Sequence, residues 1–235
     1  VGEVLDGTSI AGAWAGDDWK YERTWTYVDG APRSDAVAVT MLDAGVRTGV
    51  GSATGLVETD RSLTITDASD RVVYEFDGRP ALEVYREAFG DAVDSFQFLL
   101  TKPMGYDLGG EEPTVFVPGP SPFEDDPDTA LHVTGPIEEG WTVSVLDTSQ
   151  DAVLDGTERA AEAALADAGH PDDVAAVLVY DCMCRWYHLS DAETRAAEAR
   201  IVQEAVGEDV PVAGFYSYGE VHAPGPMAGA RNQSI

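Results

Sequence analysis

The stretch Val174-Ala-Ala-Val-Leu-Val-Tyr180 is an uninterrupted apolar run that lies between two helix-forming patterns. The Ala- and Glu-rich residues Ser149–Ala168 predict a helix before it, and Ser190–Val206 predict a helix after it. An apolar run of this kind is typical of a strand covered on both faces. Two further strands are expected at Trp141–Leu146 and Val210–Tyr218. The order β-α-β-α-β predicts a layered sheet with helices packed on it for the C-terminal portion.

The N-terminal portion is rich in β-branched and aromatic residues, and its alternation predicts strands joined by turns. Pro80 suits the first position of a helix that Gly90 ends. The expected strands are Thr8–Trp14, Arg23–Val28, Asp35–Leu42, Ser62–Thr66 and Arg71–Phe76. The predicted fold class is therefore mixed α/β (α+β), with a β-rich N-terminal portion packed on the layered C-terminal portion.

Residues 109–128 interrupt these patterns with five prolines, two adjacent glycines and a cluster of acidic residues. This composition predicts a surface excursion or internal linker without a folded element. A short strand is expected after it, at His132–Thr134.

The chain is strongly acidic, with 43 Asp and Glu residues against 14 Lys and Arg and a formal net charge of -29. Acidic disorder would lack aromatic residues, whereas this chain has five Trp, nine Tyr and seven Phe. A cationic partner would require the acidic residues in one block, and they are dispersed along the chain. A surface adapted to high salt fits best. At molar salt the Debye length is only about 3 Å, so the repulsion between the acidic side chains is screened. The scarcity of lysine, which occurs only at Lys20 and Lys102, also favours an extreme halophile.

Several classes of function and location are disfavoured by composition. No basic stripe exists that could displace counterions from nucleic acid. Two cysteines, Cys182 and Cys184, do not make a secreted disulfide framework. No signal peptide and no apolar run long enough for a membrane is present, so a cytoplasmic location without membrane contact is expected. The chain starts at Val1 within an apparently structured stretch, which indicates a fragment of a longer protein.

The usual catalytic and cofactor motifs are also missing from the sequence. It has no P-loop, no G-x-S-x-G nucleophile elbow and no G-x-G-x-x-G between a strand and a helix. An enzyme is therefore not expected, and no cofactor is predicted.

A metal site or enzymatic centre is the alternative, built around Cys182, Cys184 and His188. If this stretch is an extended strand, the single residue between Cys182 and Cys184 leaves both sulfur atoms on the same side of the strand. Zinc sites, however, usually have two to four residues between paired cysteines. Buried free thiols at a strand end are the simpler interpretation of the same residues.

Two motifs that end apolar strands place polar residues where layered α/β sheets bind ligands. They are Asp181-Cys-Met-Cys-Arg185 and Gly214-Phe-Tyr-Ser-Tyr-Gly-Glu220. Arg185 is suited to hold a carboxylate and Glu220 an ammonium group, unless the two side chains simply pair with each other. The predicted ligand-binding residues are Cys182, Arg185, Tyr216, Tyr218 and Glu220, with Asn232 closing the site.

Four stretches in a consistent order resemble the FIST family. Glu75-Phe-Asp-Gly-Arg-Pro-Ala-Leu-Glu-Val-Tyr85 is similar to the segment that joins the family's two halves. Val179-Tyr-Asp-Cys-Met-Cys-Arg185 resembles its strand ending in Ser-Cys-x-x-Arg, with Asp181 in place of Ser. The Gly214–Glu220 stretch matches its Gly-Phe-x-x-x-Gly-Glu signature. Asn232-Gln-Ser234 resembles its terminal Asn-Gln-Thr, with Arg231 where a histidine is usual.

This resemblance implies a domain organisation and a role. Residues 1–78 would be the later part of a FIST N-terminal domain, and residues 79–235 a FIST C-terminal domain. The family implies an intracellular sensory module that binds a small ligand, with an amino acid as the suspected class, and regulates an attached signalling output domain. An amino acid would suit Arg185 and Glu220, because it carries both charges.

Overall fold

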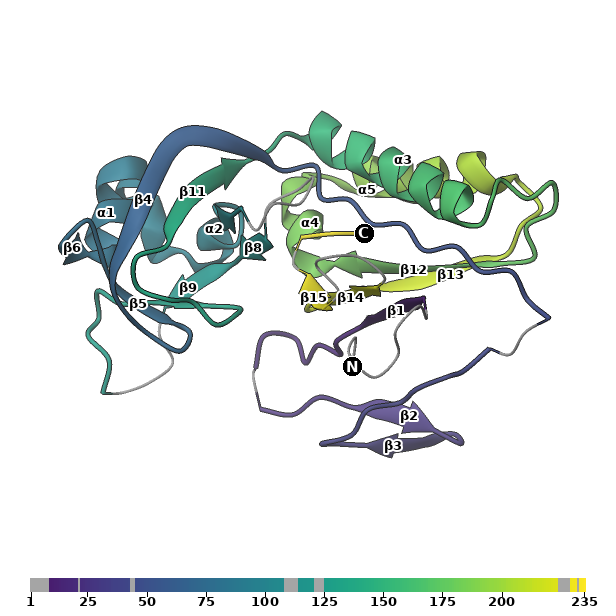
Figure 1. The fold of residues 1–235 in the computed structure, drawn as a ribbon, viewed down its shortest axis with the longest axis horizontal. Coiled ribbons are helices and arrows are strands. Elements are labelled where there is room, and N and C mark those ends of the chain that lie inside the picture. The colour runs from purple at the N-terminus through teal and green to yellow at the C-terminus, as the bar shows by residue number, and fades with distance from the viewer. Residues whose placement is uncertain are drawn as a thin grey trace.

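The computed structural model describes residues 9–20, 22–42, 45–107, 114–120, 125–223, 229–231 and 233–235. Two regions lie side by side in Figure 1. The eight-stranded region, residues 57–147, is built on one antiparallel sheet with short helices. The parallel-pair region, residues 148–235 with residues 45–56 running along it, is built on two parallel strands and longer helices. The mixed α/β class expected from the sequence is confirmed.

The eight-stranded sheet has the strand order β8-β7-β11-β4-β5-β10-β9, with β6 paired to β5. The central strand β4 pairs with β11 and with β5, and its register shifts where it passes from Ile65 to Ala68. Such irregularities bend a strand, and β4 curves visibly in Figure 1. The strands are β4 (Val57–Ser69), β5 (Val72–Phe76), β6 (Arg79–Pro80), β7 (Met104–Tyr106), β8 (Thr114–Phe116), β9 (Pro118–Pro120), β10 (Leu131–Val133) and β11 (Thr142–Asp147).

An apolar core holds this region together. Helix α1 (Ala81–Phe89) ends at Gly90, as predicted, but Pro80 is its N-cap and not its first residue. The helix buries Val84 and Tyr85 against the sheet. The 3₁₀ turn η1 (Gly90–Asp94) and helix α2 (Phe96–Leu99) follow it. The core includes Phe76, Leu131, Val133 and Val143, all at most 1% exposed.

The prediction of a featureless linker over residues 109–128 is wrong in part. Strands β8 and β9 fall within it, although residues 108–113 and 121–124 lie outside the described residues. Strand β9 contains two prolines and lies at the end of the strand order. An edge strand tolerates proline because the missing N–H faces no neighbouring strand.

The parallel-pair region follows the predicted chain order, but its sheet is smaller than expected. Strands β12 (Val177–Cys182) and β13 (Val212–Ser217) pair in parallel, whereas β11 joins the eight-stranded sheet instead. Helices α3 (Gln150–Asp167) and α5 (Ala192–Val206) pack on each other above the pair, and α4 (Met183–His188) follows β12 directly. The N-cap of α5 is Asp191, whose carboxylate accepts two backbone N–H groups.

The expectation that the apolar run is covered on both faces is wrong. Asp181 and Tyr216 are register partners on the face towards α5, because both contact Glu198 there. On the opposite face Leu178 and Phe215 are 69% and 53% exposed. Apolar side chains at this surface, and not a second buried layer, account for the continuous apolar pattern.

The N-terminal segments form small sheets below the parallel pair in Figure 1. Strand β1 (Ile10–Ala13) pairs with β14 (Glu220–Ala223), which pairs with β15 (Gly229–Arg231). Strands β2 (Thr26–Val28) and β3 (Ala31–Arg33) form a hairpin, in which Tyr27 and Val28 are exposed.

The predicted strand Asp35–Leu42 is absent from the structure. Apolar residues occur at every second position of this segment, as in a half-buried strand. The segment nevertheless forms no strand, and Val37, Val39 and Met41 are each more than three-quarters exposed. Alternation makes a segment suitable for a strand, yet a strand forms only where a neighbour supplies hydrogen bonds.

A glycine-rich extended segment, residues 49–55, packs directly on the backbone of α3. Helix α3 has a small residue at every fourth position, at Ala152, Gly156, Ala160 and Ala164, and its C-cap Ala168 continues this spacing. A Cβ atom at Gly51 would overlap the carbonyl oxygen of Ala160, and one at Gly55 that of Ala152. Gly55 also has φ +81, which non-glycine residues rarely adopt. This close approach brings residues 53–55 to the site described next.

Candidate functional site

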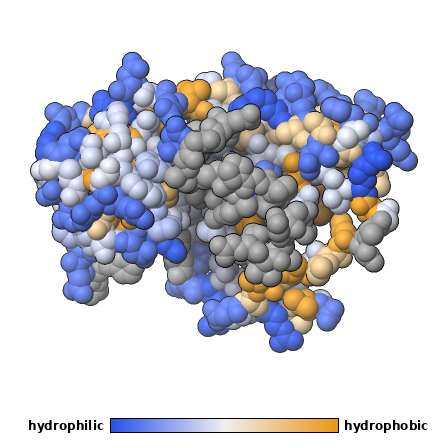
Figure 2. All heavy atoms as spheres, viewed as in Figure 1, coloured by the Kyte–Doolittle hydropathy of each residue, from blue (hydrophilic) through white to orange (hydrophobic). Residues whose placement is uncertain are grey.

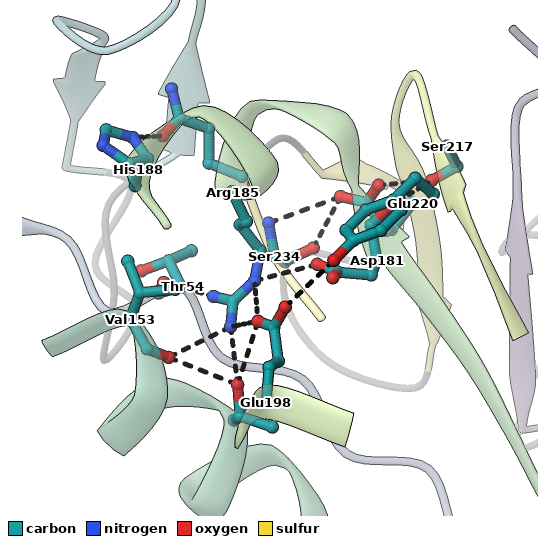
Figure 3. Close-up of polar contacts among 12 residues, drawn as sticks. Thr54, Val153, Asp181, Arg185, His188, Glu198, Ser217, Glu220 and Ser234 are labelled. Atoms are coloured by element: carbon teal, nitrogen blue, oxygen red, sulfur yellow. Dashed lines mark hydrogen bonds and ion pairs between the residues drawn. The ribbon is translucent and has the colours of Figure 1, made fainter. Parts of the chain in front are cut away.

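Arg185 lies at the centre of a buried polar cluster that joins distant parts of the chain (Figure 3). Its side chain is 1% exposed. Nη1 donates to the carbonyl of Thr54 at 2.7 Å, and Nη2 donates to the carbonyl of Val153 at 3.0 Å and to Thr157 Oγ1 at 2.7 Å. A single guanidinium thus connects the 49–55 segment with α3. We call Arg185 and its partners the Arg185 hub.

Two carboxylates complete the hub. Glu198 Oε1, from α5, accepts from Arg185 Nη2 at 2.6 Å and from Nε at 3.2 Å. Asp181 Oδ1, from the end of β12, lies 2.9 Å from Arg185 Nε. Burial alone would lower the pKa of Arg185, but Asp181 and Glu198 outweigh burial and raise that pKa, so the guanidinium stays charged.

The hub has one carboxyl group more than its single cation can balance. Burial raises the pKa of Asp181 well above its usual range, opposed by Arg185 and reinforced by Glu198. Asp181 Oδ1 is also buried without a well-oriented hydrogen bond. Protonation of Asp181 would remove the excess charge, since an unpaired buried carboxylate is costly.

Glu220 occupies a separate buried position at the start of β14. Its carboxyl group is hydrogen-bonded to Ser217 Oγ at 2.6 Å and to Ser234 Oγ at 2.9 Å. Burial raises the pKa of Glu220 well above its usual range, and its hydrogen bonds to the two serines oppose this only in part. The simple pairing of Arg185 with Glu220 is not what the structure shows, because the ion pairs of Arg185 are with Asp181 and Glu198.

The two predicted tyrosines lie in different environments. Tyr216 Oη is 3.5 Å from Glu198 Oε2 on the helix-facing side of β13. Tyr218 comes after the end of β13, and its ring stacks on Trp19 at 4.6 Å between centroids. The alternation that would place both tyrosines on one face stops at Ser217, where the strand ends. Asn232 lies outside the described residues.

The two cysteines are free and buried, as in the simpler of the two interpretations. Cys182 ends β12, but Cys184 lies in α4 and not in the extended strand that was expected. A hydrogen bond with Cys184, together with burial, raises the pKa of the Cys182 thiol well above its usual range. His188 Nε2 lies 2.9 Å from Gln233 Oε1. Among the described residues no group of three or more His, Cys, Asp or Glu is arranged to hold a metal ion.

The carboxyl ends of β12 and β13 are covered by an aromatic cluster that sequence reasoning missed. Trp19, from the loop after β1, lies against Tyr218, against Phe96 of α2 and against Tyr187 of α4. Cys182 and Cys184 lie in the small apolar cluster beneath it. A tryptophan next to two acidic residues in a loop gave no periodic signal that could have revealed this position.

Glu198 was also missed, although a signal existed. It lies four residues before Val202, and both are the buried residues of α5. A carboxylate on the buried stripe of a helix requires a cation, and Arg185 was available.

Two surface cavities lie elsewhere, beside Tyr74 in the eight-stranded region. Their volumes are about 370 Å³ and 300 Å³, and the smaller includes Arg71, Asp126 and His132 in its lining. None of the predicted site residues lines either cavity.

Comparison with known families gives two matches that follow each other along the chain. Residues 2–79 match the FIST N domain, and residues 81–223 match the FIST C domain. The boundary falls at Pro80, between β6 and α1, so strands from both matches share the eight-stranded sheet. No curated protein and no solved structure matches the chain. No helix among the described residues is long and apolar enough to cross a membrane.

Proposed function

Because the chain belongs to the FIST family, we propose that it is a sensory module that binds a small ligand and regulates an attached output domain. FIST domains are generally sensory domains of signal-transduction proteins. The ligand would bind over the carboxyl ends of β12 and β13, next to Cys182 and Tyr218. Ligands bind at this end of parallel strands in many α/β proteins.

The Arg185 hub is the observation that carries this proposal. Its hydrogen bonds and ion pairs tie the 49–55 segment, β12, α3 and α5 to one side chain. A change at the strand ends would therefore reach four elements through a few buried contacts. We propose that the hub has two arrangements, and a ligand that binds one of them better would shift the population towards it.

Arg185 has a different role in this proposal from the carboxylate clamp that its sequence position suggested. The guanidinium is buried and donates to protein oxygens through Nε, Nη1 and Nη2. A ligand carboxylate would have to displace Glu198 or a carbonyl group to reach it. We therefore assign Arg185 to coupling between elements, and leave ligand contact to residues at the strand ends.

A binding screen with a structural readout tests the proposed function. The twenty amino acids and a set of small metabolites would be screened by thermal shift and calorimetry in multimolar KCl. At least one compound should raise the melting temperature and slow hydrogen exchange in residues 49–55. Binding without any change in exchange at that segment would contradict coupling through the hub, and no binding would contradict the sensory role.

The acidic surface supports a further part of the proposal, a working environment of high salt. Hydrophilic residues cover much of the face shown in Figure 2, and the net charge is -29. Salt screens the repulsion between such charges. The free energy of unfolding should rise steeply between dilute buffer and multimolar KCl, and an unchanged value would contradict the proposal.

A further inference from the structure

Trp19 lies in its aromatic surroundings in the way that a bound ligand would. The indole ring stacks on Tyr218 with an interplanar angle of 19° and meets Phe96 edge-on at 5.2 Å. Its Nε1 donates a hydrogen bond to Tyr187 Oη at 3.1 Å. One face of the indole ring is stacked and its single N–H donor is hydrogen-bonded, and the side chains that contact it come from three separate parts of the chain.

The segment that carries Trp19 is a loop with a strained backbone. Asp18 and Trp19 have φ angles of 61° and 60°, two successive left-handed conformations in residues that are not glycine. Asp17 anchors the loop by accepting the backbone N–H of Glu22 at 2.7 Å and of Arg23 at 3.2 Å. The strain is offset by what Trp19 contacts, and a molecule that replaced Trp19 would release it.

The loop that carries Trp19 contributes no residue to the apolar core of the eight-stranded region. Trp19 is only partly buried, and residues 14–19 belong to no strand or helix. The floor beneath the indole consists of Leu100, Val117 and the two cysteines, all of them buried. Departure of the indole would therefore uncover a preformed apolar floor.

The position of this aromatic site also links it to the hub. Tyr187 accepts the indole N–H, and it lies in the same short helix, α4, as Arg185. Cys182, at the end of β12, lies in the floor and is adjacent in sequence to Asp181 of the hub. Replacing the Trp19 indole by a ligand would therefore change a contact of α4, the helix that carries Arg185.

We propose that Trp19 is an intramolecular occupant of the ligand site, and that the ligand is a planar aromatic molecule with an N–H donor, such as an indole or the side chain of tryptophan. This inference rests on the proposed sensory function and specifies its ligand class. The ligand would take the place of the Trp19 ring, stack on Tyr218 and donate to Tyr187. Displacement of the loop would then accompany binding.

Calorimetry with indole as the probe tests this inference on the full chain in multimolar KCl. Wild type should bind indole weakly, because Trp19 competes for the site, and Trp19→Ala should bind it at least about tenfold more tightly. Trp25→Ala is the matched control, since Trp25 is 45% exposed and lies outside the aromatic site. Equal affinity in wild type and Trp19→Ala would overturn the inference.

Two further measurements keep the test decisive if Trp19→Ala folds poorly. Gly16→Ala would place a Cβ atom 2.6 Å from the Tyr218 ring, which should push the loop away and tighten indole binding with Trp19 still present. Indole should bind about three- to tenfold more tightly than 1-methylindole, and Tyr187→Phe should remove this difference. A difference that survives Tyr187→Phe would contradict the assigned hydrogen bond.

The outcomes separate this inference from the function on which it rests. If an amino acid or metabolite binds equally to wild type, Trp19→Ala and Gly16→Ala while indole binds none of them, the ligand class is wrong and the sensory function stands. If no small molecule binds any variant, both are wrong.

Discussion

The two regions of the molecule are stabilised in different ways. The eight-stranded region closes around a continuous core of apolar side chains from α1 and the sheet. The parallel-pair region has at its centre a charged arginine, two carboxyl groups and a backbone-to-backbone contact of glycines with α3. Apolar cores tolerate gradual change, whereas a buried charge network fails when one member is lost. This difference favours the first region as scaffold and the second as the part that responds.

The largest effect is expected from Arg185→Met. Removing the cation leaves the buried carboxyl groups of Asp181 and Glu198 without a positive charge to balance them, which should lower the free energy of unfolding by about 3–5 kcal/mol. Arg86→Met is the matched control, because the Arg86–Asp94 ion pair is on the surface and should cost less than about 1 kcal/mol. Denaturant unfolding in KCl measures both, and equal losses would remove the proposed contrast between the regions.

The next effect concerns the glycine contact with α3. Gly55→Ala combines left-handed strain of about 1–2 kcal/mol with overpacking of about 1–3 kcal/mol, roughly 3 kcal/mol together. Gly140→Ala in the eight-stranded region has a similar φ of 86° but nothing within 4 Å of the added Cβ, so only the strain applies. Unfolding measurements that give the same loss for both would show that the close approach does not matter.

The third prediction concerns pH. Burial raises the pKa of Glu220, so the folded state holds this proton more tightly than the unfolded chain does. Its stabilising contribution is therefore complete below the ordinary carboxyl pKa and is lost as pH rises towards the raised value, by up to about 1.4 kcal/mol per pH unit. Glu220→Gln should flatten the decline of stability above the ordinary carboxyl pKa without abolishing it, because the pKa of Asp181 is raised too. An unchanged slope would contradict a protonated Glu220.

The smallest effect is expected on the open face of the parallel pair. Leu178→Ala should change the free energy of unfolding by no more than about 0.5 kcal/mol, because the side chain is 69% exposed. For comparison, Ile65→Val removes one methylene group from the apolar core of the eight-stranded region and should lower the free energy of unfolding by about 1 kcal/mol. A larger loss for Leu178→Ala, seen in thermal unfolding, would indicate that another surface covers this face in solution.

Local patterns predicted much of the fold. The periodicity of α3 and α5, the Pro80–Gly90 helix and the apolar run of β12 all appear close to their expected bounds. The alternating residues 35–42 did not become a strand, because alternation cannot supply a pairing partner. The same limit explains β11, which was expected beside β12 and pairs with β4 and β7 instead.

In the candidate site, too, local sequence patterns predicted some features and the packing of distant segments decided the others. The strand-end motifs indicated Cys182, Arg185 and Glu220 as important, and all three are buried at or near strand ends. Their partners came from segments far along the chain, with Thr54 of the glycine-rich segment and Glu198 of α5 on Arg185. Nothing in the spacing of these residues indicated that they would meet.

The sequence by itself determined the acidic character, the helix and strand periodicities and the resemblance carried by the strand-end motifs, because each depends on residue types close together in the chain. The tertiary structure decided that Arg185 is a buried connector and that Trp19 covers the strand ends. Trp19 and Tyr218 are almost two hundred residues apart, and the pairing of β1 with β14 brings them together. Such contacts depend on how separate elements pack, and local periodicity carries no information about that packing.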